Sequence, residues 1–427
     1  MNGAKNLVDD CFLHDRDRMR HADVVSLITS RLNCVVRSSE LPLGSLEGRL
    51  LAETVEAPRN VPLHDNSAVD GYAFAHTEYS ANNTLAIGPR IAAGDPPSGP
   101  LAGASAARIF TGASMPPNAD TVAMQEDCTV SADGLLVTVP PGLKLGANRR
   151  LAGEDVKAGE RLLVPGQRLR AQEIAAIASL GRSGLRIFDK LRVAIVSTGN
   201  ELVEPGSGQS FGEGQVFDTN RHMLNALCRN LPLEITDLGI LTDDEETITA
   251  VLSKAAADHD VILTTGGASR GEEDHIVRTI DRLGKRHIWQ IAIKPGRPMS
   301  FGQIGDCVFL GLPGNPVAAF VCFLLYCRPA LLTLGGGIYD EPQRYPLPAG
   351  FAIKSKKPDR REFLRGWLET DTSGRTVVRK FARDGSGLIS GLRSARGFIE
   401  LGEDVRKVDE GDVVAYIPFS ELGIDAL

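Results

Sequence analysis

The chain has 427 residues, which is too long for one ordinary domain, so two to four domains are expected. Its hydrophobic content of 42% and charged content of 24% are typical of a soluble globular protein, and its net charge of −7 argues against a nucleic-acid partner. The N-terminus has no apolar signal segment and no apolar run is long enough to cross a bilayer, so no membrane partner is expected. Together with scattered cysteines that form no CxxC pair, this predicts a cytoplasmic protein.

The first half of the chain consists of predicted helical pieces around a β-rich stretch. Apolar residues recur at helical spacing over 21–36, and 46–58 indicates another helix or a turn that leads into an extended link. Short apolar runs separated by Gly and Pro turns predict strands within 85–150. A short alanine-rich helix follows at 171–180, and Gly181 ends it.

Three turns of this half carry polar groups. Asp65 and Asp70 flank a turn of small residues, where ordinary turn chemistry is favoured over ligand contact if the motif is taken alone. Thr111 follows a predicted strand and precedes a glycine, which suits an oxyanion contact but is also a common structural feature. Asp155 lies in a later stretch with glycines at turn spacing.

From Leu191 onward, predicted strands alternate with helices. The predicted strands are 191–199, 233–241, 260–267, 288–296 and 307–312, and the predicted helices are 218–230, 243–258, 272–284 and 316–327. This alternation predicts βαβ units and a mostly parallel sheet covered on both faces, hence an α/β domain. Residues 340–427 show short alternating runs between frequent turns, which predicts a small all-β barrel or sandwich.

Loops marked by Gly and Pro follow several of these strands, at the edge where open parallel sheets bind ligands. The polar residues placed near this edge are Ser197, Thr198, Glu201, Asp218, Asn220, Asp243, Asp244, Ser269, Asp274, Lys294, Arg297 and Asn315. Carboxylates and hydroxyls suit a hard cation such as Mg²⁺, whereas Lys294 and Arg297 suit oxyanions. No P-loop, GxGxxG, HExxH or GxSxG motif occurs. The residues alone therefore predict an Mg²⁺-dependent enzyme that acts on a nucleotide or another phosphorylated anion.

Eight sequence blocks give a more specific prediction. In chain order they are SAVDGYA, RIFTGASMPPNADTVAMQED, GEDVKAGE, VSTGNELVEPG, TNRHML, TTGGASRGEED, KPGRP and LPGNPVAA. Together they resemble the molybdopterin molybdenumtransferase family, which includes the C-terminal domain of gephyrin. The resemblance implies an elongated homodimer whose subunits have four domains. These are a discontinuous N-terminal dimerisation domain (1–58 and 152–188), an inserted β-rich domain (59–151), a three-layer α/β molybdopterin-binding domain (189–335) and a C-terminal β-barrel domain (336–427).

The same resemblance implies the reaction and its partners. Molybdate would be inserted into adenylylated molybdopterin with Mg²⁺, and AMP would be released. An adenylylating enzyme and molybdoenzyme chaperones are the possible protein partners. Because the pterin's own sulfurs finally hold molybdenum, no cysteine ligand is needed. The protein's task is to position two anions and a divalent cation.

The residues of the ligand edge and the family motifs together define the predicted site. The predicted catalytic residues are Asp70, Thr111, Asp155, Glu201, Asp243, Asp244, Asp274, Lys294 and Arg297, with Asp274 as the metal ligand. The predicted substrate-binding residues are Ser197, Gly199, Asn220, Gly266, Gly267, Ser269, Pro295, Pro313, Gly314, Asn315, Arg365 and Ser390. Asp70, Thr111 and Asp155 are expected to come from the partner subunit of a dimer.

Four positions depart from the family pattern and leave alternatives open. Arg270, Arg297, Ala318 and Arg396 stand where the family usually has a small apolar residue, a lysine, a serine and an asparagine. One alternative is a paralogue with another oxyanion preference, such as tungstate. The others are a nucleotide-processing hydrolase that shares only the α/β domain and a non-catalytic scaffold.

Overall fold

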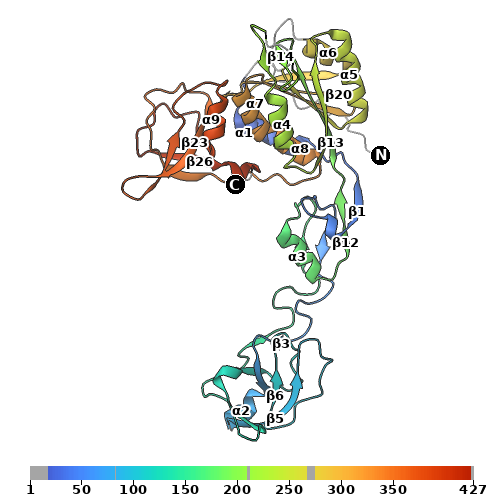
Figure 1. The fold of residues 1–427 in the computed structure, drawn as a ribbon, viewed down its shortest axis with the longest axis vertical. Helices are drawn as coiled ribbons and strands as arrows, with labels where there is room; N and C mark the ends of the chain where they lie inside the picture. The colour runs from blue at the N-terminus through green and yellow to red at the C-terminus, as the bar shows by residue number, and fades with distance from the viewer. Residues whose placement is uncertain (1–17, 82, 209–211, 267–274, 425–427) are drawn as a thin grey trace.

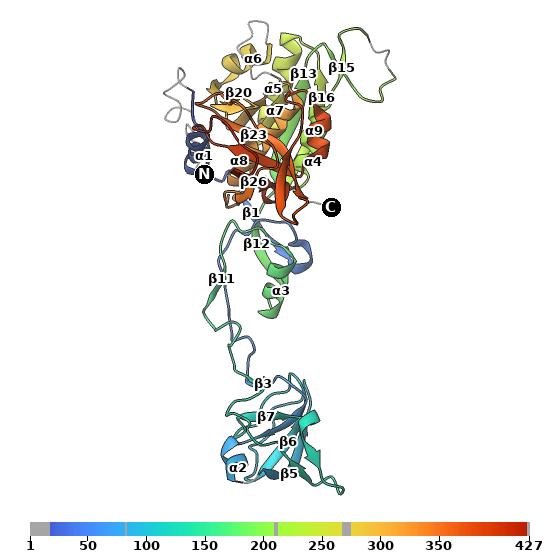
Figure 2. The ribbon, with the colours of Figure 1, turned by 90° about the vertical axis from the view of Figure 1, so that its left-hand side faces the viewer.

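The computed structural model describes residues 18–424 except 82, 209–211 and 267–274. The molecule is elongated (Figure 1). A β-rich segment from the first half of the chain lies at one end, and an α/β sheet lies at the other beside a C-terminal sheet. The view at 90° shows the same separation (Figure 2).

Two stretches of chain run side by side between these ends. Three short antiparallel pairs connect them: β1 (Ser38–Pro42) with β12 (Gly184–Phe188), β2 (Val55–Glu56) with β11 (Arg161–Leu163), and β3 (Asn66–Ser67) with β10 (Arg149–Arg150). The 3₁₀ turn η1 (Leu43–Ser45) and helix α3 (Ala171–Ser179) pack on this connection around Leu51, Leu169 and Ile177.

The predicted helix within 46–58 is wrong, and only its alternative, a turn at 47–48, is seen. The chain after the turn is extended. Leu50 bridges to Arg168, and Leu51 bridges to Ile187 while its amide donates to the Gln167 carbonyl at 2.9 Å. Tertiary pairing has satisfied these backbone groups in place of helical hydrogen bonds.

The inserted segment forms a six-stranded sheet in the order β7-β4-β6-β5-β9-β8. Its strands are β4 (Gly71–Phe74), β5 (Thr84–Ile91), β6 (Ser105–Ile109), β7 (Thr121–Met124), β8 (Thr129–Val130) and β9 (Leu136–Thr138), with α2 (His76–Ala81) and η2 (Gln125–Asp127) between them. Separate apolar clusters cover its two faces, one around Phe74 and Leu85 and the other around Ile91 and Ile109. The strands predicted within 85–150 are therefore confirmed, and this sheet has its own core.

The α/β sheet has the order β16-β13-β17-β21-β20-β18. Its strands are β13 (Leu191–Thr198), β16 (Leu233–Leu241), β17 (Val261–Thr265), β18 (Lys285–Gln290), β20 (Pro298–Ile304) and β21 (Cys307–Leu312), and the short β14 (Leu202–Val203) and β15 (Val216–Phe217) pair beside it. The first four strands of this order are parallel, as predicted, whereas β20 runs antiparallel to both of its neighbours, β21 and β18.

The prediction of a single strand over 288–296 is wrong, because this stretch contributes to two strands. The chain leaves the α/β sheet after Gln290, and β19 (Ile293–Lys294) pairs instead with a strand of the C-terminal sheet. The next strand, β20, then returns antiparallel to β18. The same apolar run thus serves two sheets, which periodicity alone does not reveal.

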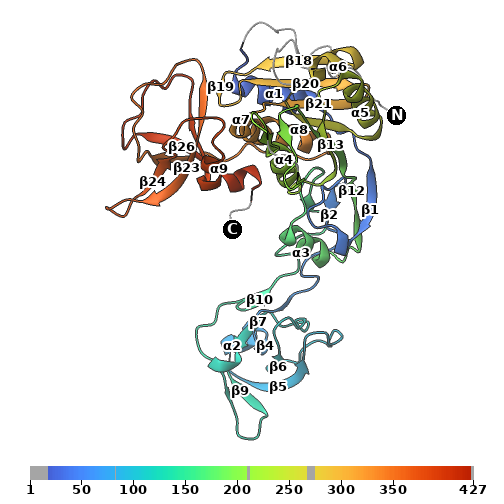
Figure 3. The same cartoon turned by 45° about the horizontal axis from the view of Figure 1, so that its top comes forward.

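Helices cover both faces of the α/β sheet (Figure 3). The α5 (Glu245–Asp258) and α6 (His275–Leu283) helices pack on one face. The other face is covered by α1 (His21–Arg31), α4 (Asn220–Cys228), α7 (Pro316–Cys322), the π-helical η3 (Phe323–Cys327) and α8 (Arg328–Leu334).

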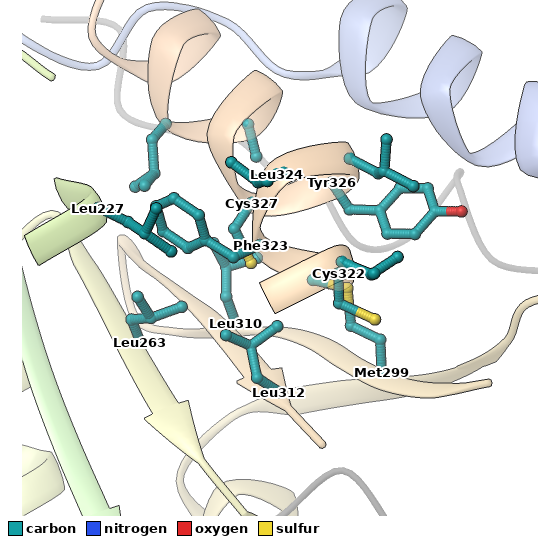
Figure 4. Packing of buried hydrophobic residues seen from close by; sticks show 14 of the residues in the cluster. Leu227, Leu263, Met299, Leu310, Leu312, Cys322, Phe323, Leu324, Tyr326 and Cys327 are labelled. Atoms are coloured by element: carbon teal, nitrogen blue, oxygen red, sulfur yellow. The ribbon is translucent and has the colours of Figure 1, made fainter. Parts of the chain in front are cut away.

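The helix over 316–334 lies at the centre of this core (Figure 4). Among the described residues it alone is long and apolar enough to cross a membrane, so the expectation that no run reaches that length is corrected. However, 83% of it is buried inside the protein, as expected of a core helix. Its Tyr326 hydroxyl lies 2.9 Å from Nδ1 of His21, which joins α1 to this core.

The C-terminal residues form a curled sheet in the order β19-β23-β25-β26-β22, and a further strand, β24, also pairs with β23. Its own strands are β22 (Tyr345–Pro348), β23 (Arg361–Thr370), β24 (Thr376–Lys380), β25 (Gly397–Leu401) and β26 (Val413–Pro418), with α9 (Ile389–Ser394) and η4 (Phe419–Leu422). A bridge between Ala349 and Val378 brings the chain after β22 against β24. Since β19 belongs to this sheet, the loop after it is fixed next to β23.

Candidate active site

A cavity of about 780 Å³ lies between the ligand edge of the α/β sheet and the C-terminal sheet. The loops that follow β17, β19 and β21 form one side, and β23 with the loop after β24 forms the other. The lining residues are Gly266, Lys294, Pro295, Gly296, Pro298, Pro313, Gly314, Asn315, Val317, Ala318, Phe363, Leu364, Arg365, Lys380, Phe381, Asp384, Gly385 and Ser386. Seven of the predicted site residues are among them.

Two glycines let the backbone follow the cavity wall closely. Gly266 has φ +96° and Gly296 has φ +106°, conformations that other residues rarely adopt. A Cβ on Gly296 would lie 2.5 Å from Sγ of Cys322, whose thiol donates to the Gly296 carbonyl. The Lys294–Gly296 turn is therefore packed directly against the core helix.

The cationic side chains of the cavity are already engaged by protein groups. Lys294 Nζ lies 3.6 Å from the buried Glu362 carboxylate. Arg365 is 7% exposed, and its guanidinium donates to the carbonyls of Arg383 and Leu388, at 2.9 and 3.1 Å. Burial lowers the pKa of Arg365, although a guanidinium stays charged at neutral pH. These contacts fix the orientation of the Lys294 and Arg365 side chains in the cavity.

Polar groups behind the cavity fix the loops that form it. Ser197 and Thr265, on neighbouring parallel strands, have hydroxyls 3.0 Å apart. Asn220 donates from Nδ2 to the Gly314 carbonyl at 2.7 Å, and it is 7% exposed. Its Oδ1 is buried and accepts no hydrogen bond from the described residues. Asn220 therefore positions the Pro-Gly-Asn loop and retains one unused acceptor.

The loop after β13 reaches toward α5. Gly199 has φ +145°, and a Cβ there would lie 2.5 Å from the Glu201 carboxylate. The amide of Asp243 donates to Oδ1 of Asn200 at 3.1 Å. These contacts hold two predicted acidic residues on adjacent loops.

Two other acidic residues of the predicted edge have structural partners. Asp244 caps helix α5, since its carboxylate accepts from the Thr247 amide at 2.8 Å. Hydrogen bonding by the Thr247 side chain and amide lowers the pKa of Asp244. Asp218 is 1% exposed and accepts from Nε of Arg221 at 2.9 Å. Arg221 also pairs with Asp237 at 2.6 Å, so Asp218 is committed to a buried ion-pair network rather than to the cavity.

The insert sheet holds the other predicted cluster. The Asp70 carboxylate accepts from both the amide and the hydroxyl of Thr111, each at 2.8 Å, and these two hydrogen bonds lower its pKa. Beside them, Arg108 donates to the Gly71 carbonyl at 2.9 Å. The insert sheet that carries this cluster and the two sheets that border the cavity lie at opposite ends of the molecule (Figure 1).

Several predicted residues do not meet the cavity. Arg297 and Ser390 are exposed and do not line it, although each is close in sequence to residues that do. Asp155 is exposed on the connection between the two ends. Gly267, Ser269 and Asp274 lie outside the described residues, as does Arg270.

Sequence reasoning also missed residues that do form the cavity. Lys380, Phe381 and Asp384 line it, and Glu362 pairs with Lys294. They come from the C-terminal sheet, where the alternation of short strands gave no sign of a ligand site. The only available signal was the Gly-Ser pair at 385–386, which is too common to identify a site alone.

Comparisons with known proteins agree along most of the chain. The MoeA N-terminal region (domain I and II) matches residues 19–181, a probable molybdopterin binding domain matches 194–333, and the MoeA C-terminal region (domain IV) matches 346–419. A molybdopterin molybdenumtransferase of Haemophilus influenzae is 35% identical over 93% of this chain and 98% of its own length. Another from Nostoc is 34% identical over 74% of this chain and 73% of its own. The crystal structure of a molybdopterin biosynthesis MoeA protein from Pyrococcus horikoshii has a TM-score of 0.74 at 31% identity, covering 94% of this chain and 99% of that one.

Proposed function

Because this chain belongs to the molybdopterin molybdenumtransferase (MoeA) family, we propose that it inserts molybdenum into molybdopterin to give molybdenum cofactor. The observation that carries the proposal is the cavity between the two sheets. It combines the glycine-marked ends of parallel strands with three cationic side chains, Lys294, Arg365 and Lys380. Backbone approach and positive charge together suit a ligand with several anionic groups.

The substrates in this proposal are adenylylated molybdopterin and molybdate. An oxygen of molybdate or of water attacks the adenylyl phosphorus, the phosphoanhydride bond breaks, and the pterin phosphate is the leaving group. Attack by water gives AMP directly, whereas an adenylyl-molybdate formed by molybdate releases AMP when water hydrolyses it. Lys294 and Arg365 offset the negative charge of the two anions, and the loops at Gly266 and 313–315 hold the pterin side. Molybdenum is transferred to the pterin sulfurs, so the buried cysteines of the core helix take no part.

Mg²⁺ belongs to the proposal through the family resemblance. Among the described residues no group of three or more His, Cys, Asp or Glu side chains could hold a metal ion. Asp274, the proposed ligand, lies outside them. Mg²⁺ is commonly held by one or two carboxylates together with substrate phosphates, whose charge it would offset when bound. Loss of AMP release on chelation, restored by added Mg²⁺, is the outcome expected from the proposal.

The proposed active form is a homodimer. Support comes from the position of Asp70 and Thr111, which adjoin β4 and β6 of the insert sheet, at the other end of the molecule from the sheets that border the cavity (Figure 1). In a dimer whose subunits run in opposite directions, the insert sheet of one subunit can approach the cavity of the other. Mixing Asp70→Ala subunits with Lys294→Ala subunits tests this, because only heterodimers regain one complete site. Failure of the mixture to recover any activity would argue against contributions in trans.

The transferase assay uses the purified full chain with adenylylated molybdopterin, Mg²⁺ and either molybdate or tungstate, and follows AMP. AMP release that requires an oxyanion supports the proposal, and the preferred oxyanion identifies the paralogue. Lys294→Met should lower the rate at least ~10-fold, whereas Lys254→Gln, which changes an exposed lysine on α5, should leave it unchanged. Release without an oxyanion would favour the hydrolase, and no release would favour the scaffold.

A further inference from the structure

The cavity carries more positive than negative charge. Lys294, Arg365 and Lys380 supply three cations, whereas Asp384 on its wall and Glu362 beside Lys294 supply two carboxylates. At full ionisation these five side chains carry a net charge of +1, and Arg360, 3.1 Å from the Glu362 carboxylate, adds a further positive charge behind the cavity wall. A dianion entering the site would be repelled by the Asp384 carboxylate on the wall if all these side chains stayed in place.

The two carboxylates differ in how firmly they are held. Glu362 is 5% exposed within β23, where Arg360 donates to it at 3.1 Å. Asp384 lies on the loop between β24 and α9, and its side chain is 64% exposed. Its ion pair with Lys380 Nζ, at 3.0 Å, is weak and exchangeable because one partner is largely hydrated. Asp384 can leave the cavity at small cost, whereas Glu362 cannot.

The backbone that carries Asp384 is fixed on both sides. Arg365 donates to the carbonyls of Arg383 and Leu388, and its guanidinium lies 5.0 Å from the centre of the Phe381 ring. On the opposite side of the cavity, the Val317 amide at the start of α7 donates to the Ser386 carbonyl at 2.9 Å. The loop backbone is thus held from both sides, while the Asp384 side chain is largely exposed and contacts the end of Lys380 through one ion pair.

We propose that Asp384 is an internal counter-anion, whose carboxylate neutralises Lys380 in the empty cavity and is displaced by a bound tetrahedral oxyanion. The proposal rests on the proposed function only for the identity of that oxyanion. Turning Asp384 out removes one negative charge from the cavity and frees Lys380, which favours binding of a dianion such as molybdate. Competition by this tethered carboxylate weakens oxyanion binding and favours release after transfer.

The electrostatics of Asp384 agree with this geometry. Burial alone would raise its pKa, but the hydrogen bond and charge of Lys380 outweigh burial, and Lys294 and Arg365 add to the effect. The net result is a lowered pKa, so the carboxylate is ionised at neutral pH. All three cavity cations therefore act on the same carboxylate, as they would on a bound oxyanion.

The test is a calorimetric titration of the full chain with molybdate alone. Asp384→Asn should bind molybdate roughly 3- to 5-fold more tightly than the wild type, because the competing charge is gone. Lys380→Met should weaken binding, and in that background Asp384→Asn should give a much smaller gain. Glu410→Gln is the matched control, since it removes an exposed carboxylate of the same C-terminal unit without touching the cavity.

Unchanged or weaker binding by Asp384→Asn, or an equal gain in Glu410→Gln, would overturn the inference. Thermal melting of each variant establishes that it is folded. The AMP assay on the wild type separates this inference from the proposed function. A wild type that releases AMP with unchanged molybdate binding in Asp384→Asn defeats the counter-anion alone. Tighter binding in Asp384→Asn without AMP release by the wild type defeats the transferase alone.

Discussion

The buried histidine that joins α1 to the core helix predicts a specific loss of stability in acid. His21 is 4% exposed, and its imidazole lies edge-on to the rings of Tyr326 and Phe363 at 5.7 and 5.4 Å. Burial, followed by the charges of Arg361 and Arg344, lowers its pKa from 6.5 to about 4. The folded protein therefore keeps this imidazole neutral at pH values where the unfolded chain protonates it.

The sign and size of the effect follow from this difference. Between pH 6.5 and 4 the unfolded state binds more protons than the folded state, so the free energy of unfolding decreases as the pH falls. With these two pKa values, lowering the pH from 7.5 to 5 removes about 2 kcal/mol, and the full loss below pH 4 is about 3 kcal/mol. Well above pH 6.5 the imidazole is neutral in both states, so it adds no pH dependence to the free energy of unfolding.

The assay is urea unfolding at pH 7.5 and 5.0, followed by circular dichroism, for the wild type and His21→Asn. The asparagine retains a polar group near the Tyr326 hydroxyl but does not titrate. The variant should be less stable at pH 7.5, yet it should lose about 2 kcal/mol less than the wild type on acidification. His64→Asn, on the surface, should behave like the wild type. Equal losses in His21→Asn and the wild type would refute the reasoning.

Three further substitutions test single contacts. Gly296→Ala should lower the free energy of unfolding by about 1–3 kcal/mol, because its methyl group meets Cys322 and its φ is positive; unchanged urea unfolding would contradict this. Asp244→Ala should lower the melting temperature by roughly 1–2 °C through loss of the α5 cap, whereas Asp244→Asn should retain it; equal melting of the two would exclude a capping role. Thr111→Val should reduce AMP release by about 10- to 100-fold at unchanged melting temperature, because Asp70 loses one hydrogen bond. Thr111→Ser keeps the hydroxyl and should therefore retain AMP release. Full activity in the valine variant would show that this pair is not part of the site.

Much of the α/β unit was predictable because its elements are regular. The strand predicted at 191–199 is observed at 191–198, and α4 begins at Asn220 within the predicted helix. Buried parallel strands are continuous apolar runs, and the loops after them collect at one edge. The sequence pattern therefore predicts Gly266 and the 313–315 loop at the ligand edge of the sheet, where they line the cavity.

The rest depended on contacts between distant segments. The extended chain at Leu50 and Leu51 is set by partners more than a hundred residues away, which outweigh its local helical pattern. Lys380 and Asp384 belong to the cavity only because β19 draws the C-terminal sheet against the α/β sheet. Local sequence spacing does not predict that two distant segments pack together. The same holds for the proposed site shared between two subunits.

Because paired strands connect the two ends of the molecule, the insert sheet should fold independently of the rest of the chain. Its entry and exit lie side by side, since Asn66 is opposite Arg150 in the β3–β10 pair, and both faces of the sheet have their own apolar cover. A gene fragment for residues 66–150 should therefore yield an autonomous folded module. Joining residues 65 and 151 through a short linker should leave a truncated chain that still folds around its buried helix.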